Sequence, residues 1–399
     1  MEHYLLDWAN LLLRALHVVT AIAWIGSSFY FVWLDNHLEA PAHAADRARG
    51  VGGELWAVHG GGFYNPQKYP VGPAQMPQGK LHWFYWESYS TWLSGFALFV
   101  TLYLWNADTF LVDKSRFDWP GWVAGLVALA FLVVGWFVYD GICRLAGRKP
   151  DGSVGGDARV AVLVSLAIVV ASWLACQLFA GRAAFLLVGA MLATWMSANV
   201  AAVIIPGQRK VVAALQAGQA PDAIHGQRGK QRSVHNTYLT LPVLAAMLSN
   251  HYPMLTQPRH NWLVLCALLL LGTLMRQFFV ARHRGPSPWA LMAASVALLA
   301  ALVLALAPAA PSTTGLSSAP VDFAQLRTVI DQRCVGCHNA QVQGKAIALH
   351  EPELIVRHAS LLYLQTVVTR QMPMGNATAM TDPERELVQR WFLGGARGP

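Results

Sequence analysis

The sequence contains 399 residues, of which 55% are hydrophobic and only 13% are charged, and its net charge is +8. Soluble domains carry about a quarter charged residues, so this composition excludes a soluble globular protein and predicts a membrane protein with a small soluble part. We attribute the positive charge to membrane topology and expect membrane lipid, but no nucleic acid, as a partner.

Eight apolar runs are long enough to cross a bilayer. They lie at roughly residues 11–34, 83–106, 120–143, 159–180, 183–205, 235–254, 261–281 and 287–308. The first ten residues carry Glu2 and Asp7 but no Lys or Arg, which argues against a cleavable signal peptide. We therefore predict an all-α fold in which residues 1–308 form an eight-helix transmembrane bundle with both ends on one side.

Polar side chains inside a span are costly, so each one is a candidate for function. His17 lies inside the first span, about two turns before Trp24; the alternative is a histidine that only bonds a neighbouring helix. The second span opens with further candidates, namely His82, Trp83, Trp86 and Glu87. An interfacial aromatic belt explains the tryptophans equally well, but it does not explain the glutamate.

A loop of residues 35–80 separates the first two spans and is unusually long. Its centre, residues 53–64, is rich in glycine and aromatic residues and includes His59. Two interpretations fit this composition: a β-hairpin with turn glycines, or a lid over a pocket.

Several polar residues of the later spans share a predicted depth. If odd spans run inward and even spans run outward, this set lies in the cytoplasmic half of the membrane, whereas His17 and His251 lie nearer the other face. The set comprises His82, Glu87, Asp140, Asn199, His235 and Asn236.

Basic residues are concentrated in the loops after the third, fifth and seventh spans, and the opposite loops contain few. The basic loops hold Arg144, Arg148, Lys149, Arg159, Arg209, Lys210, Arg228, Lys230, Arg232, Arg282 and Arg284. Cytoplasmic loops carry the excess of Lys and Arg, so we predict that both termini lie outside the cytoplasm.

Residues 309–320 are predicted to be a linker to a C-terminal domain at 321–399. That domain contains Cys334, Cys337 and His338 in the CxxCH signature for one covalent haem c. The two thiolates would add to the porphyrin and His338 would ligate the iron. A zinc or redox CxxC is the alternative, but no second metal-spaced pair lies nearby. Haem is attached in this way outside the cytoplasm, in agreement with the charge distribution.

Residues 323–333 and 383–393 are predicted to be amphipathic helices, the second with Asp382 as its N-cap. Two terminal helices around a haem resemble the class I cytochrome c family. A thioether is the usual second ligand in such domains, and Met372, which precedes a proline, is our prediction for it. The alternatives are Met374, Met380, His350 and His358, and we expect the histidines to face solvent.

Four runs of the membrane part, joined to the CxxCH domain, resemble the integral-membrane cytochrome c urate oxidase (urate hydroxylase) family over nearly the whole chain. The runs are 17–36, 53–64, 81–96 and 233–253, and Tyr85 departs from the lysine of many members. The resemblance implies oxidation of urate to 5-hydroxyisourate in purine degradation, with the tethered cytochrome as electron acceptor. It also implies a multi-pass protein of the bacterial inner membrane with periplasmic termini, which passes electrons to another cytochrome c or a terminal oxidase.

Urate is a flat, hydrogen-bonding anion, so its oxidation requires an apolar slot, polar partners for the ring edges and a base. The candidate bases are His17, His82, Glu87 and His235. The candidate binding residues are Trp24, His59, Trp83, Trp86, Asn199 and Asn236.

Two functions without urate chemistry remain open from the sequence. One is a membrane-anchored cytochrome that oxidises quinol. The other is an electron-transfer subunit with a membrane b-type haem, ligated by histidines of different spans such as His17 and His251.

Overall fold

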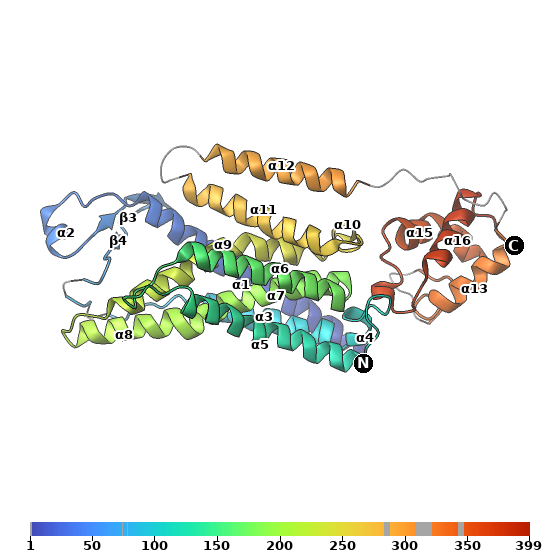
Figure 1. Cartoon of the computed structure of the whole chain (residues 1–399), viewed down its shortest axis with the longest axis horizontal. Coiled ribbons are helices and arrows are strands. Elements are labelled where there is room, and N and C mark those ends of the chain that lie inside the picture. Colours follow the sequence, from blue (N-terminus) through green and yellow to red (C-terminus); the bar gives the residue numbers. More distant parts are fainter. Residues whose placement is uncertain (1, 74, 78, 283–287, 308–320, 342–346) are drawn as a thin grey trace.

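A computed structural model describes residues 2–73, 75–77, 79–282, 288–307, 321–341 and 347–399. Figure 1 shows a long bundle of helices with a small helical domain at one end. The N-terminus lies at the same end of the bundle as this domain, and a loop region with short strands lies at the other end (Figure 1). The predicted linker, 309–320, lies outside the described residues.

The bundle is built from helices that follow the apolar runs of the sequence. They are α1 (Glu2–His37), α3 (Trp86–Phe99) with η1 (Val100–Leu104), α5 (Gly121–Leu145), α6 (Asp157–Leu178), α7 (Gly181–Ala198) with η2 (Asn199–Ile204) and α8 (Ile205–Gln216), α9 (Ala223–Ser249), α11 (Asn261–Ala281) and α12 (Trp289–Ala305). Two short helices, α4 (Ala107–Phe110) and α10 (Pro253–Thr256), lie in the loops at the end nearest the C-terminal domain.

Five of the described helices are long and apolar enough to cross a membrane: Tyr4–His37, Gly121–Leu145, Asp157–Leu178, Gly181–Gln216 and Asn261–Ala281. The other three predicted spans correspond to α3 with η1, α9 and α12. Helix α3 has 14 residues before it continues as a π-helix, and α12 has 17. Helix α9 has 27 residues, but its first half is polar. The five helices indicate a membrane protein.

Helix α7 lies at the centre of the bundle and is buried along most of its length. It packs against α5, α6 and α9, while α1 packs along α3. Helices α9 and α11 also approach closely: a Cβ at Gly272 would come within 2.7 Å of the Pro242 nitrogen. Small residues at helix crossings allow such close contact in membranes.

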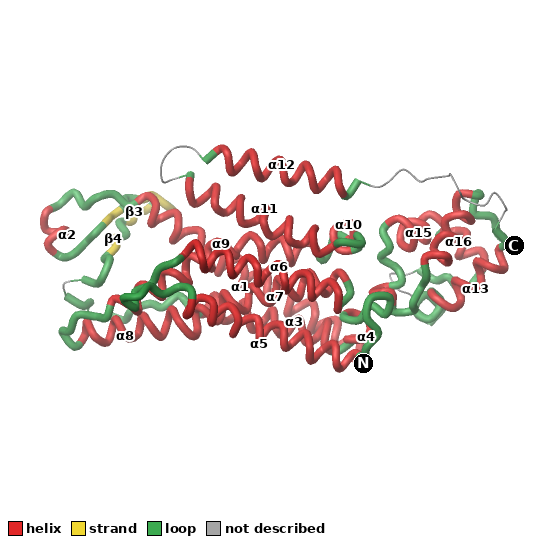
Figure 2. Tube along the Cα trace, viewed as in Figure 1, coloured by secondary structure: helices red, strands yellow, loops and turns green. Residues whose placement is uncertain are grey.

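The long loop forms two small antiparallel sheets and a short helix, α2 (Ala44–Ala48), as Figure 2 shows. β2 (Ala57–His59) pairs with β3 (Gly62–Tyr64), and Gly60 and Gly61 supply the positive φ angles of the turn between them. β1 (Gly53–Glu54) pairs with β4 (Gln67–Lys68). The loop thus contains the β-hairpin that was one of the two interpretations of its composition.

The C-terminal domain contains α13 (Phe323–Arg333), α14 (Pro352–Arg357), α15 (Ala359–Tyr363), η4 (Leu364–Val368), η5 (Met374–Asn376) and α16 (Asp382–Leu393). Helices α13 and α16 pack together around a core that includes Leu326, Ile330 and Trp391. The predicted N-cap of α16 was wrong. Thr381 is the cap, because its hydroxyl accepts the Glu384 N–H while the Glu384 carboxylate accepts the Thr381 N–H.

Candidate functional site

A hydrogen-bonded cluster of polar side chains lies inside the bundle, where α5, η2 and α9 meet. Nδ2 of Asn199 donates to the Tyr139 hydroxyl and to Oδ1 of Asn236, both at 2.9 Å. The Tyr139 oxygen also lies 2.8 Å from Nδ1 of His235. The structure thus brings together three of the predicted site residues, Asn199, His235 and Asn236, with a tyrosine that sequence reasoning left out.

An ion pair lies directly beside this cluster. The Arg232 guanidinium is 2.7 Å from Oδ1 of Asp140 and sits over the Tyr139 ring at 5.0 Å from its centroid. Arg144 contacts the other oxygen of Asp140 at 2.6 Å. Arg232 precedes His235 by three residues on α9, so both side chains face the same side of that helix.

A second buried arginine, Arg276 of α11, lies near the same level but has no carboxylate partner among the described residues. Its side chain is only 2% exposed. Its Nε donates to the Thr237 carbonyl at 3.1 Å, and its guanidinium lies 3.8 Å from the centre of the Phe29 ring. A buried cation without a counter-ion is costly, so this arginine is suited to receive an anion.

Several buried polar atoms of α3, α7, η2, α9 and α11 have no hydrogen-bond partner among the residues that the structure describes. They are Oε2 of Glu87, Nε1 of Trp195, Oδ1 of Asn199, Nη1 of Arg232 and Nη2 of Arg276. Buried polar groups are normally satisfied. Donors and acceptors are both present in this set, and the indole of Trp195 stacks on Tyr139 with 4.7 Å between ring centroids. Each of these atoms could form a hydrogen bond with a polar ligand that reached it.

His17 lies at the contact between α1 and α3, and Glu87 lies in the first turn of α3. Ser88 donates to Ser197 of α7 at 3.1 Å, which places the first turn of α3 beside the region that leads into η2. Nδ1 of His17 lies 3.0 Å from the Thr91 carbonyl and 3.1 Å from the Ser94 hydroxyl. His17 is therefore positioned one to two turns from Glu87 along α3, on the side toward the C-terminal domain.

The remaining predicted residues are not joined to the cluster by any interaction that the structure shows. Trp24 is half-buried against the core and Trp83 is half-buried. Trp86 is 62% exposed, His82 is exposed beside Phe84, and His59 is exposed on β2.

Sequence reasoning missed Tyr139, Trp195, Arg232 and Arg276 as site residues. The available signals were the positions of Tyr139 and Asp140 at the end of a span and the three-residue spacing of Arg232 and His235. The sequence contains no comparable signal for Arg276, because this residue falls near the end of an apolar run.

In the C-terminal domain, Cys334 is buried, Cys337 is exposed, and neither forms a disulfide. Burial raises the pKa of the Cys334 thiol to about 12. Nδ1 of His338 lies 3.0 Å from the Ile347 carbonyl. This bond leaves Nε2 available as a ligand and orients the ring, as is usual for metal-binding histidines.

The segment that contains Met372 is held by a buried arginine. Arg385 donates to the Met372 carbonyl at 2.9 Å and to the Thr366 carbonyl. Met380 is buried in the domain core, whereas Met372 and Met374 are half-buried. The described residues contain no group of three or more His, Cys, Asp or Glu side chains that could hold a bare metal ion. The domain thus contains two thiols, one oriented imidazole and three thioethers, and the predicted haem ligands His338 and Met372 are among them.

The two domains meet at the end of the bundle nearest the N-terminus, where α4 packs against η5. A cavity of about 690 Å³ lies between them, with Tyr103 and Phe110 on one side and Met374 and Arg385 on the other. None of the candidate urate-binding residues lines it. We therefore consider it part of the domain interface and place the candidate site within the bundle.

The sequence matches the model of one protein family, described as urate oxidase N-terminal, over residues 3–307. The match covers the bundle and ends before the C-terminal domain. No curated protein and no solved structure matched the chain. Because the matched residues make up most of its length, the chain belongs to the urate oxidase N-terminal family.

Proposed function

We propose that the protein oxidises urate to 5-hydroxyisourate in the membrane bundle and passes the electrons to a haem c in its C-terminal domain. The observation that carries this proposal is the buried cluster of Tyr139, Asn199, His235 and Asn236, surrounded by polar atoms without partners. Membership of the urate oxidase N-terminal family supports urate as the substrate.

The side chains provide the parts that this reaction needs. Oδ1 of Asn199 and Nε1 of Trp195 are unpaired acceptor and donor for the edges of the ring. Arg276 would balance the negative charge of urate, because it lies buried without a carboxylate. A guanidinium suits this role because its planar fork matches a flat anion.

Formation of 5-hydroxyisourate removes two electrons and two protons as water adds its hydroxyl to the ring. His235 is our candidate for the first proton acceptor, because a neutral imidazole has one unprotonated ring nitrogen. The Tyr139 oxygen accepts a hydrogen bond from Asn199, and its second lone pair can accept one from Nδ1–H of His235. This pair can therefore fix the histidine tautomer and orient Nε2 as a base. Glu87, with one buried oxygen unpaired, is the second candidate.

Cys334 and Cys337 would attach the haem, and Nε2 of His338 and the sulfur of Met372 would ligate its iron. When bound, the haem would accept the two electrons of urate one at a time. Ile347 would hold the ring of His338, and Arg385 would hold the backbone at Met372.

Electrons would then have to travel along the bundle, and α3 with η1 offers a route. Glu87 and Tyr103 are separated by about 24 Å at the rise of a helix. Trp92 stacks on Phe96 at 5.1 Å between ring centroids, and Phe99 stacks on Tyr103 at 5.8 Å. Phe110 follows Tyr103 at 5.9 Å and belongs to α4, which contacts the C-terminal domain. These aromatic rings shorten the gaps that electron transfer must cross.

The topology that we propose has eight spans in the bacterial inner membrane, with both termini in the periplasm. The end of the bundle near the C-terminal domain would be periplasmic, and the basic loops would be cytoplasmic. Electrons would leave the C-terminal domain to another cytochrome c or a terminal oxidase.

The experiment that tests this function is an assay of the purified protein with urate and an external cytochrome c. The proposal predicts loss of urate, transient 5-hydroxyisourate and two cytochromes reduced per urate, without hydrogen peroxide. Cys337→Ala should abolish this turnover. Full turnover by a haem-free variant, or peroxide formed in proportion to urate, would contradict it.

A further inference from the structure

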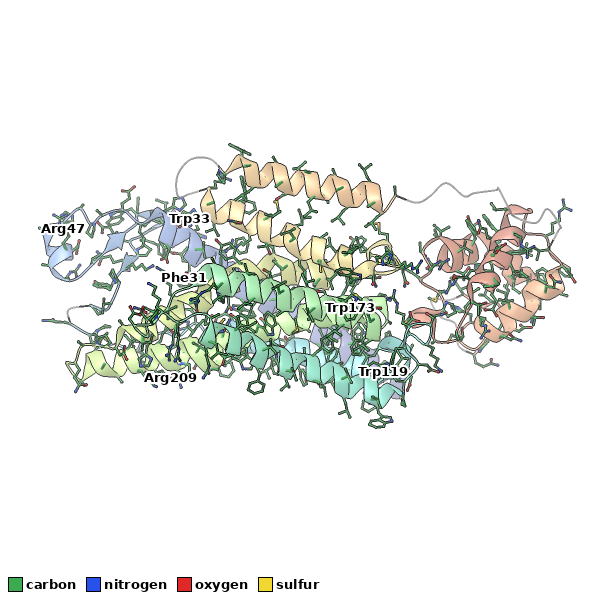
Figure 3. All side chains as sticks on the ribbon, viewed as in Figure 1. Phe31, Trp33, Arg47, Trp119, Trp173 and Arg209 are labelled. Atoms are coloured by element: carbon green, nitrogen blue, oxygen red, sulfur yellow. The ribbon has the colours of Figure 1, made fainter. Side chains whose placement is uncertain are left out.

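A second, smaller cavity of about 160 Å³ lies where the end of α5, the start of α8 and the first half of α9 meet. This is the end of the bundle opposite the C-terminal domain, marked in Figure 3 by Arg209 of α8. Five basic side chains and one carboxylate line the cavity: Arg144, Arg148, Lys210, Arg228, Arg232 and Asp140.

The charges of this lining are poorly balanced. Asp140 is its one carboxylate, and it is already paired with Arg144 and Arg232. Arg148, Lys210 and Arg228 take part in no ion pair among the residues that the structure describes. The side chain of Arg232 is only 4% exposed, yet its buried Nη1 has no hydrogen-bond partner in the described part of the chain. An unpaired buried guanidinium nitrogen beside an excess of positive charge is a site for an anion.

The cavity is also adjacent to the polar cluster. Arg232 lines it and lies over the Tyr139 ring, and Cys143 lines it with Sγ 3.8 Å from Nδ1 of His235. One layer of side chains thus separates the cavity from the candidate base. Pockets for drug-sized ligands measure about 300–1,000 Å³, so this cavity accommodates a smaller molecule.

We infer that this cavity captures the substrate as a small, planar organic anion and admits it to the polar cluster from the end opposite the C-terminal domain. The inference rests on the proposed function for the identity of the anion, which is urate. Guanidinium groups recognise planar anions through paired hydrogen bonds, and the surplus charge would raise the local concentration of the anion.

Charge removal at matched positions tests this inference. The double variant Lys210→Gln/Arg228→Gln removes two cations that line the cavity. The control Arg209→Gln/Lys230→Gln removes the same charge from the same two helices, at exposed residues outside the lining. Binding of radiolabelled urate to the purified full-length protein should weaken about tenfold at low salt in the first variant only. This difference should shrink at high ionic strength.

Measurements of turnover distinguish a failure of this inference from a failure of the proposed function. In a protein that oxidises urate, the first variant should raise KM with little change in kcat. Equal urate binding by both double variants would overturn the inference and leave urate oxidation intact. If the protein binds urate through the cavity but does not oxidise it, the inference stands and the proposed function fails. Oriented membrane vesicles give a second test. If urate is oxidised only when it is added to the face that carries the C-terminal domain, the inference is overturned.

Discussion

The hydroxyl of Tyr139 lies 2.8 Å from Nδ1 of His235, and this contact joins α5 to α9 inside the bundle. The same oxygen accepts a hydrogen bond from Asn199, and its second lone pair can accept one from Nδ1–H of the histidine, which leaves Nε2 unprotonated. Tyr139 therefore links Asn199, which we expect to bond the edge of the urate ring, to His235, which we expect to accept a proton.

Tyr139→Phe should lower kcat for urate oxidation by roughly a hundredfold, the lower range for loss of acid–base assistance. Phenylalanine keeps the stacking on Trp195 but leaves His235 without its partner. The c-type haem spectrum should not change. Ser249→Ala is the control, because it removes another buried hydroxyl, which donates to the Ala246 carbonyl near the end of α9. Similar kcat values for the two variants would exclude the proposed role of Tyr139.

Arg276→Lys should weaken urate binding at least tenfold, because an ammonium cannot reproduce the planar contacts of a guanidinium. The expected change is a higher KM, with a smaller effect on kcat. Steady-state kinetics with urate measures both. Arg182→Lys, a half-buried arginine that bonds Asn250 at the other end of the bundle, is the control. An unchanged KM in Arg276→Lys would mean that the charge of the substrate is balanced elsewhere.

Met372→His should keep the haem low-spin and lower its reduction potential, since an imidazole replaces a thioether. A spectroscopic redox titration of the full-length protein measures this shift. The parallel variants Met374→His and Met380→His should leave the potential near that of wild type. A lowered potential in one of these, with no shift in Met372→His, would assign the axial sulfur to that residue.

The C-terminal domain should lose stability in acid through Glu384. Partial burial alone would raise the pKa of this carboxyl, but the Thr381 N–H and Arg333 together outweigh burial and lower the pKa. A lowered folded-state pKa gives stability that is present above the unfolded value of about 4.3 and lost as pH falls through the folded value.

Hydrogen exchange of α13 and α16 in the full-length protein, compared at pH 7 and pH 3, measures this acid effect. Wild type should lose protection relative to its neutral-pH value. Glu384→Gln should be less protected at pH 7 and should lose less on acidification. The same acid loss in both proteins would rule out Glu384 as the titrating group.

Much of the architecture was predictable because apolar length and amphipathic period determine it locally. The predicted helix at residues 323–333 is α13 with the same bounds, and the grouping of Asn199 with His235 and Asn236 followed from their common depth. The cap of α16 was assigned to Asp382 instead of Thr381, because adjacent capping residues compete and the carboxylate of Glu384 decides between them.

The rest of the candidate site depends on which helices become neighbours. Nothing in the sequence around Tyr139 indicates that Asn199, 60 residues later, bonds its hydroxyl. In the same way, the pairing of Arg276 with Phe29 requires α11 to pack near α1. Long-range contacts of this kind have no local signature in a single sequence.

Anaerobic addition of urate to the oxidised, purified protein tests the central claim most directly. The account predicts that the c-type haem bands change to the reduced form, with one urate consumed for every two haems. The response should be lost in Cys337→Ala and strongly slowed in Tyr139→Phe. A haem spectrum that stays oxidised in the presence of saturating, bound urate would contradict electron transfer from urate to the C-terminal domain.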